Sequence, residues 1–171
     1  GGHSYFANEA LVHNTNIFAF SYTDAKQNKF VSYKTRLLPF VQQSKFGPFL
    51  EMWREILKRH PTIPGYVSSN DVNLSFELWG GRNPHLVKYT EPLEASLLFA
   101  RRGQVILPPS VLTAKFDFPS APMRGLVDKD YVWNYQQAQA EAEATLSELE
   151  DGSGYLGMEG EVWYLQTDDG Q

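Results

Sequence analysis

Hydrophobic and polar residues alternate with a period of two in two runs near the start of the chain. The first run is NIFAFSY at residues 16–22, and the second is FVSYKTRLL at residues 30–38. This period is typical of β-strands, and the polar residues 24–29 between the runs are suited to a turn. The pattern therefore predicts a β-hairpin made of two aromatic-rich strands.

A spacing of three and four residues follows Pro48, in FLEMWREILKRH at residues 49–60. This spacing gathers apolar side chains on one side of a helix, and proline is well tolerated in a first helical turn. A second helix is predicted over residues 130–150, which are rich in Ala, Gln, Glu and Leu and precede Asp151-Gly152. Because heptads are not sustained, we expect a solvated connecting helix rather than a coiled coil.

Alternation returns in LSFELW at residues 74–79, where Leu74, Phe76 and Leu78 share one face of a strand. Glu77 points to the other face. A carboxylate in so apolar a strand is costly unless a polar group meets it. On spacing alone, an edge strand with a solvated polar face explains Glu77 about equally well.

Further strands are predicted later in the chain. Residues 92–100 form one strand pattern, residues 101–104 a turn, and residues 105–107 the returning strand. Residues 155–171 return to a strand pattern after the second helix. At the other end of the chain, residues 5–7 and 10–12 could form a short hairpin at the edge of the domain.

The composition fits one soluble domain. The 171 residues are 42% hydrophobic, and no apolar run approaches the roughly 18 residues needed to span a bilayer. Nothing at the start resembles a signal peptide, so we expect no membrane partner. The absence of cysteine excludes disulfides and thiol nucleophiles and fits a cytoplasmic location.

The charge is distributed unevenly along the chain. Residues 15–125 carry 14 Lys and Arg against 8 Asp and Glu, whereas residues 126–171 carry 1 against 11. The basic part permits a polynucleotide partner despite the net charge of −5. A solvated acidic helix on an ordinary surface explains the same asymmetry.

The first 14 residues, GGHSYFANEALVHN, resemble the C-terminal end of inteins. The resemblance implies that Asn14 cyclises through its side-chain amide, with His13 and the upstream His3 acting as acids or bases. Thr15 would supply the hydroxyl that receives the upstream fragment. Because the rest of the intein is missing, we expect residues 1–14 to be a remnant and residues 15–171 to form the domain proper.

Two motifs in residues 15–171 resemble the ATP-dependent nucleic-acid ligases, and most of all the RNA ligases. Phe76-Glu77-Leu78-Trp79-Gly80, followed by Arg82-Asn83, is similar to motif III, which implies that Glu77 meets the ribose of a nucleotide. Thr15-Asn16-Ile17 is similar to the continuation of motif I, which implies a nucleotide-binding role for Asn16. The lysine that becomes adenylylated would then lie upstream of the intein.

The same resemblance implies further site residues. Lys34 and Arg36 correspond to basic residues that approach phosphates, although a basic edge strand that discourages aggregation explains them as well. Phe99 corresponds to the aromatic residue of motif IIIa that stacks on adenine, and the ordinary alternative is a core phenylalanine. Glu159, in Met158-Glu159-Gly160-Glu161-Val162, is similar to the motif IV glutamate that helps to hold a divalent metal.

Together these motifs imply an α+β fold of the nucleotidyltransferase type, built on antiparallel strands and incomplete at both ends, since motif V would follow Gln171. The implied function is that of an RNA ligase fragment, inactive alone. The whole enzyme would join 5′-phosphate and 3′-hydroxyl ends through lysyl-AMP and adenylylated-end intermediates, using ATP and Mg²⁺. The alternatives are a DNA ligase, a protein-splicing segment, and a non-catalytic module that binds RNA or DNA with salt-dependent affinity.

Overall fold

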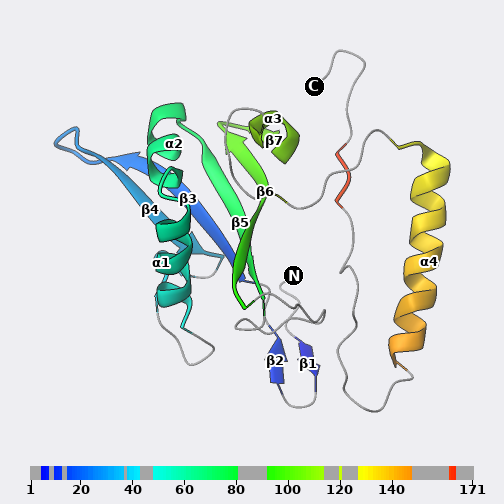
Figure 1. Ribbon diagram of the computed structural model, residues 1–171. Helices are drawn as coiled ribbons and strands as arrows, with labels where there is room; N and C mark the ends of the chain where they lie inside the picture. The colour runs from blue at the N-terminus through cyan, green and yellow to red at the C-terminus, as the bar shows by residue number, and fades with distance from the viewer. Residues whose placement is uncertain are drawn as a thin grey trace.

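The computed structural model describes residues 5–7, 10–12, 15–36, 38–42, 48–80, 92–113, 120, 127–147 and 162–164. These residues form an α+β fold with a five-stranded antiparallel sheet, a separate two-stranded hairpin and four helices (Figure 1). The chain therefore has the predicted α+β class and antiparallel pairing.

The large sheet has the strand order β4-β3-β5-β6-β7. Its strands are β3 (Thr15–Thr23), β4 (Lys29–Thr35), β5 (Asn73–Trp79), β6 (Glu94–Arg102) and β7 (Val105–Leu107). The predicted hairpin is confirmed as β3 and β4, joined by a turn in which the Asp24 carboxylate accepts hydrogen bonds from the backbone N–H groups of Lys26 and Asn28. The remaining two strands, β1 (Tyr5–Ala7) and β2 (Ala10–Val12), pair with each other as expected.

The helices are α1 (Phe49–Arg59), α2 (Ile63–Asn70), α3 (Pro109–Thr113) and α4 (Lys129–Ser147). Helices α1 and α4 match the predicted helices closely. Helix α2 was not predicted, because Pro64 and Gly65 disfavour a helix and only Ile63 and Val67 mark its buried side. Its last residue is followed by Asp71 in the left-handed conformation, which ends the helix before β5.

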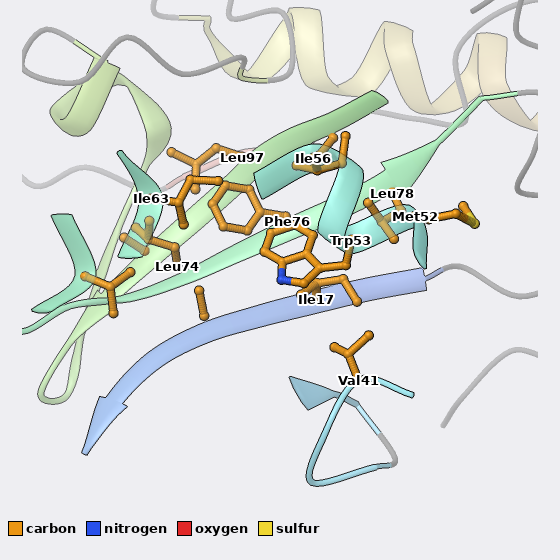
Figure 2. Packing of buried hydrophobic residues seen from close by; sticks show 14 of the residues in the cluster. Ile17, Val41, Met52, Trp53, Ile56, Ile63, Leu74, Phe76, Leu78 and Leu97 are labelled. Carbon is orange, nitrogen blue, oxygen red and sulfur yellow. The ribbon is translucent and has the colours of Figure 1, made fainter. Parts of the chain in front are cut away.

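The core lies between the sheet and helices α1 and α2 (Figure 2). Strand β5 contributes Leu74, Phe76 and Leu78, all fully buried, and β3 contributes Ile17 from the neighbouring position. Trp53 of α1 packs against Phe76 with ring centroids 5.5 Å apart. This packing fixes one face of the sheet against the helices.

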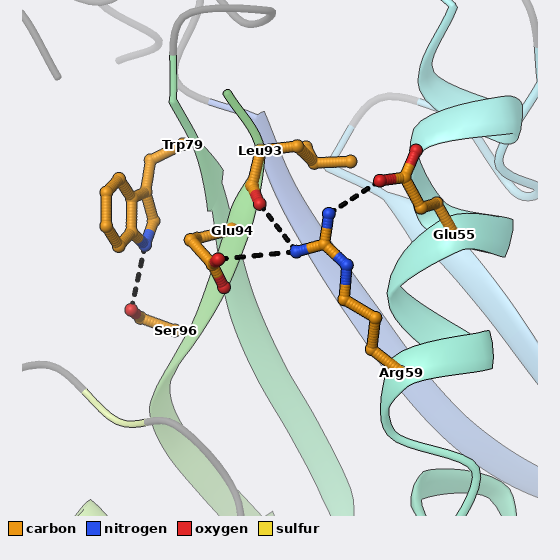
Figure 3. Close-up of polar contacts among 6 residues, drawn as sticks. All are labelled: Glu55, Arg59, Trp79, Leu93, Glu94 and Ser96. Carbon is orange, nitrogen blue, oxygen red and sulfur yellow. Dashed lines mark hydrogen bonds and ion pairs between the residues drawn. The ribbon is translucent and has the colours of Figure 1, made fainter. Parts of the chain in front are cut away.

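Arg59, near the end of α1, ties this helix to the start of β6 (Figure 3). Its guanidinium donates to the carbonyl of Leu93 at 2.7 Å and lies 3.3 Å from the Glu94 carboxylate. It also forms an ion pair with Glu55, one helical turn earlier. Because three acceptors converge on one planar cation, α1 is held at a defined position along β6.

One alternative and two expectations about local structure are wrong. The strand β5 is the central strand of the sheet, so Glu77 is not on an edge strand. Arg101 and Arg102 belong to β6, so the turn is confined to Gly103 and Gln104. The φ of 59° at Gly103 suits glycine. Of the strand predicted at residues 155–171, the described part, residues 162–164, has no strand structure.

Candidate functional site

The sheet has a second face, directed away from α1 and α2, which we call the distal face. On β3 it carries Asn16, Phe18, Phe20 and Tyr22, because the alternate residues of this strand point into the core. The pairing of the neighbouring strands assigns to it Phe30, Ser32 and Lys34 of β4, Ser75, Glu77 and Trp79 of β5, and Glu94, Ser96, Phe99 and Arg101 of β6. Most of these side chains are half-buried.

Glu77 and Asn16 are direct partners across β5 and β3. The side-chain amide of Asn16 donates a hydrogen bond of 2.6 Å to Glu77 Oε2, and the pair is partly buried. The other carboxylate oxygen, Oε1, is shielded from solvent. Because the Asn16 amide is neutral, this hydrogen bond orients the Glu77 carboxylate without placing an opposite charge beside it.

Phe99 reaches the distal face through an irregularity of β6. The register pairs Leu97 with Phe76 but Phe99 with Ser75, so Leu98 is an extra residue in this strand. Simple alternation from the buried Leu97 would turn Phe99 into the core, whereas the bulge turns it to the distal face and Ala100 into the core. The alternative that Phe99 is a core residue is therefore wrong.

Ser75 lies between two phenylalanines on neighbouring strands, Phe18 of β3 and Phe99 of β6. Its side chain is buried, and Oγ has no hydrogen-bond partner among the residues that the structure describes. A hydroxyl left in this state costs about 1 to 3 kcal/mol. Ser75 was not singled out from the sequence, although its position two residues before Glu77 places it on the same face.

Lys34 lies across from Phe18 at the other side of β3, so its side chain is also on the distal face. Arg36 directly follows β4 and is exposed. Because β4 is an edge strand of the sheet, the alternative role of these basic residues in discouraging edge pairing is structurally sound. The position of Lys34 across from Phe18 is equally compatible with a role beside the site.

Trp79 and Ser96 extend the site along β5 and β6 (Figure 3). The indole Nε1 donates a hydrogen bond of 2.9 Å to Ser96 Oγ, and Ser96 is the direct partner of Glu77 on β6. The row Asn16, Glu77 and Ser96 is therefore polar across three adjacent strands. Ser96 could not be found from the sequence, because its place depends on the pairing register of β6.

The chain after the predicted motif IV returns to the sheet beside the bulge. The hydroxyl group of Tyr164 donates to the carbonyl of Leu98 at 3.1 Å, and burial raises the pKa of this phenol. The neighbouring Trp163 meets Tyr135 of α4 edge to face, with ring centroids 5.6 Å apart. Residues 162–164 thus connect α4 with the strand that carries Phe99.

Other predicted site residues lie outside this arrangement. Thr15, the predicted splicing hydroxyl, is buried at the start of β3 on the core side. His3, His13, Asn14 and the predicted metal ligand Glu159 fall outside the described residues. The described part of the chain contains no cluster of three or more His, Asp or Glu that could hold a metal ion, and none of its helices is long and apolar enough to cross a membrane.

Comparisons of the chain with protein-family models, with curated proteins and with solved structures find no match.

Proposed function

We propose that the chain is part of the nucleotide-binding domain of an ATP-dependent RNA ligase, with the adenine nucleotide held on the distal face. The supporting observation is that Asn16, Lys34, Glu77 and Phe99, each singled out by its resemblance to ligase motifs, come from four adjacent strands and share this face. These residues are far apart in sequence. A chance resemblance gives no reason for them to share one side of a sheet.

Each residue has a distinct role in this proposal. Glu77 accepts hydrogen bonds from the ribose hydroxyl groups, and Asn16 orients its carboxylate through the bond of 2.6 Å. Phe99 offers an aromatic ring to the adenine, and Lys34 supplies positive charge toward the phosphates. When bound, ATP supplies the AMP group that activates a 5′-phosphate end for joining.

The predicted Mg²⁺ ligand, Glu159, is not one of the residues of the proposed nucleotide site. The described residues contain no group of three or more His, Asp or Glu that could hold a metal ion. A role for Glu159 in holding Mg²⁺ stays a prediction from motif IV. The nucleotide site proposed here requires no metal for the contacts that Asn16, Glu77 and Phe99 make.

Titration of AMP and ATP into the chain by isothermal calorimetry tests the proposal. Glu77→Gln should weaken binding about ten- to a hundredfold, because a charge-assisted hydrogen bond contributes roughly 1.5 to 3 kcal/mol. The matched control is Asp71→Asn, the same change of a carboxylate to an amide, at a position that follows α2 and precedes β5, roughly 20 Å from Glu77 along the chain. Equal affinity of Glu77→Gln and the parent chain, or no saturable binding at all, would contradict the proposal.

A labelling experiment separates nucleotide binding from chemistry. Since the adenylylated lysine is predicted to lie upstream of the intein, the chain should bind ATP without forming a covalent AMP adduct. Incubation with ATP labelled in the α-phosphate, followed by denaturing electrophoresis, measures the adduct. A stoichiometric adduct would show that the reactive lysine is one of this chain and that the placement of motif I is wrong.

A further inference from the structure

The β3–β4 hairpin carries three aromatic rings that the nucleotide site does not use, and two of them, Tyr22 and Phe30, are exposed. We propose that Phe20, Tyr22 and Phe30, which we call the hairpin platform, stack the bases of a single-stranded polynucleotide. All three lie on the distal face, and the hairpin extends past α2 (Figure 1). None of the three rings belongs to the proposed nucleotide site, so the inference can be tested separately from nucleotide binding.

The rings form a continuous series. Tyr22 and Phe30 are cross-strand partners and stack with centroids 5.4 Å apart and planes 25° from parallel. The ring centroids of Phe20 and Tyr22 are 6.2 Å apart, so the series continues along β3. Cross-strand aromatic pairs of this kind also stabilise a hairpin.

Exposure distinguishes this pair from the aromatic residues of the core. Tyr22 is 46% exposed and Phe30 is 43% exposed, whereas Trp53 and Phe76 on the other side of the sheet are buried. Large apolar side chains that gather on a surface mark sites of interaction. The ring surfaces of Tyr22 and Phe30 are thus partly available to a ligand.

The charge around the platform favours a polyanion. Residues 15–36 contain four basic side chains and a single acidic one, Asp24. The Asp24 carboxylate is occupied by hydrogen bonds within the turn, while Lys34 shares the distal face with the rings. An aliphatic protein segment could pack on the rings but would not complement the positive charge, and an acidic segment would complement the charge but would not stack on the rings. A polynucleotide does both.

Single strands fit the platform better than duplexes. Bases in a single strand can leave their neighbours and stack on exposed rings, whereas the bases of a duplex are stacked within the helix. Every base has a π-surface, so this mode of binding tolerates many sequences. Asn16 lies on the same strand and the same face as Phe20 and Tyr22, so a bound strand could continue from the platform toward the polar row.

Fluorescence anisotropy with labelled single strands of about 12 nucleotides tests the inference, with RNA and DNA of one mixed sequence as separate arms. Tyr22→Ala and Phe30→Ala should each weaken binding roughly tenfold, and Tyr22→Phe should retain the parent affinity because it preserves the ring. Tyr22→Leu should behave as Tyr22→Ala does, because it keeps an apolar side chain without a π-surface. Lys34→Gln should lower the slope of log affinity against log salt by about 1.

The control variant is Ile106→Ala on β7, the opposite edge of the sheet, where this apolar side chain is 49% exposed. It should bind the oligonucleotide as the parent chain does, and circular dichroism should show that every variant is folded.

Parent affinity in Tyr22→Leu and Phe30→Ala, or equal loss in Ile106→Ala, overturns the inference. Concentration-dependent self-association that Tyr22→Ala abolishes would identify a second copy of the chain as the occupant and would also overturn it. AMP affinity should be unchanged in the Tyr22 and Phe30 variants, whose residues the nucleotide site does not use, so failure here is distinguishable from failure of the nucleotide site.

Discussion

The two faces of the five-stranded sheet use similar residue types for different purposes. On the face covered by α1 and α2, Trp53 and Phe76 are buried among aliphatic side chains. On the distal face, Phe18 and Phe99 flank Ser75, and the polar row of Asn16, Glu77 and Ser96 crosses the central strands. The core face is made almost entirely of packed apolar side chains, whereas the distal face combines an oriented carboxylate with a buried hydroxyl.

The largest effect should come from the core face. Phe76→Ala should lower the free energy of unfolding by about 3 to 5 kcal/mol, because it leaves a cavity against Trp53. The same substitution at Phe20, which is half-buried on the distal face, should cost less than half as much. Urea unfolding followed by circular dichroism measures both. Equal losses would show that the two faces do not differ in the way described.

A smaller effect is expected at the contact between α1 and β6. Arg59→Ala removes the hydrogen bond to the Leu93 carbonyl and the ion pairs with Glu55 and Glu94. These groups are about one-third exposed, so solvent screening limits the loss of unfolding free energy to roughly 1 kcal/mol. Glu94→Gln should cost less than Arg59→Ala, because the Leu93 contact stays. A larger loss in Glu94→Gln would mean that the ion pair, and not the carbonyl contact, positions α1.

The smallest effect concerns the turn that joins β3 and β4. Backbone and side-chain hydrogen bonds from Asn28 hold the pKa of Asp24 below its ordinary value of 3.8. Because the pKa is lower in the folded state, the ionised carboxylate stabilises the folded turn at pH values above the unfolded pKa of about 3.8. This contribution is lost as the pH falls below that value and passes through the folded pKa. Carboxyl chemical shifts measured against pH by nuclear magnetic resonance should give a midpoint for Asp24 below 3.8. A midpoint at or above that value would contradict the turn geometry.

Much of the covered face could be predicted from the sequence, because it depends on periodicity. Alternation located β3, β4 and β5, and the helical spacing located α1. Helix α2 was not predicted, because its packing against the sheet outweighs the poor helix propensity of Pro64 and Gly65. Local patterns therefore sufficed where burial and intrinsic preference agreed.

The distal face was only partly predictable. Glu77 and Asn16 were identified separately, but their pairing depends on the register of β3 against β5, which the sequence does not specify. Phe99 was identified from a motif although its direction depends on the bulge at Leu98. Ser75 and Ser96 gave no signal of their own, because a serine in a strand has no distinctive pattern until its neighbours in the sheet are known.

The central claim is that an adenine nucleotide binds the distal face and leaves the covered face unchanged. Two indole groups report on these faces: Nε1 of Trp79 bonds to Ser96 on the distal face, and Nε1 of Trp53 is buried in the core. Their N–H signals can be assigned in nuclear magnetic resonance spectra with Trp79→Phe and Trp53→Phe variants. Saturating AMP should shift the Trp79 signal and leave the Trp53 signal in place. An unmoved Trp79 signal, or an equal shift at Trp53, would contradict the account.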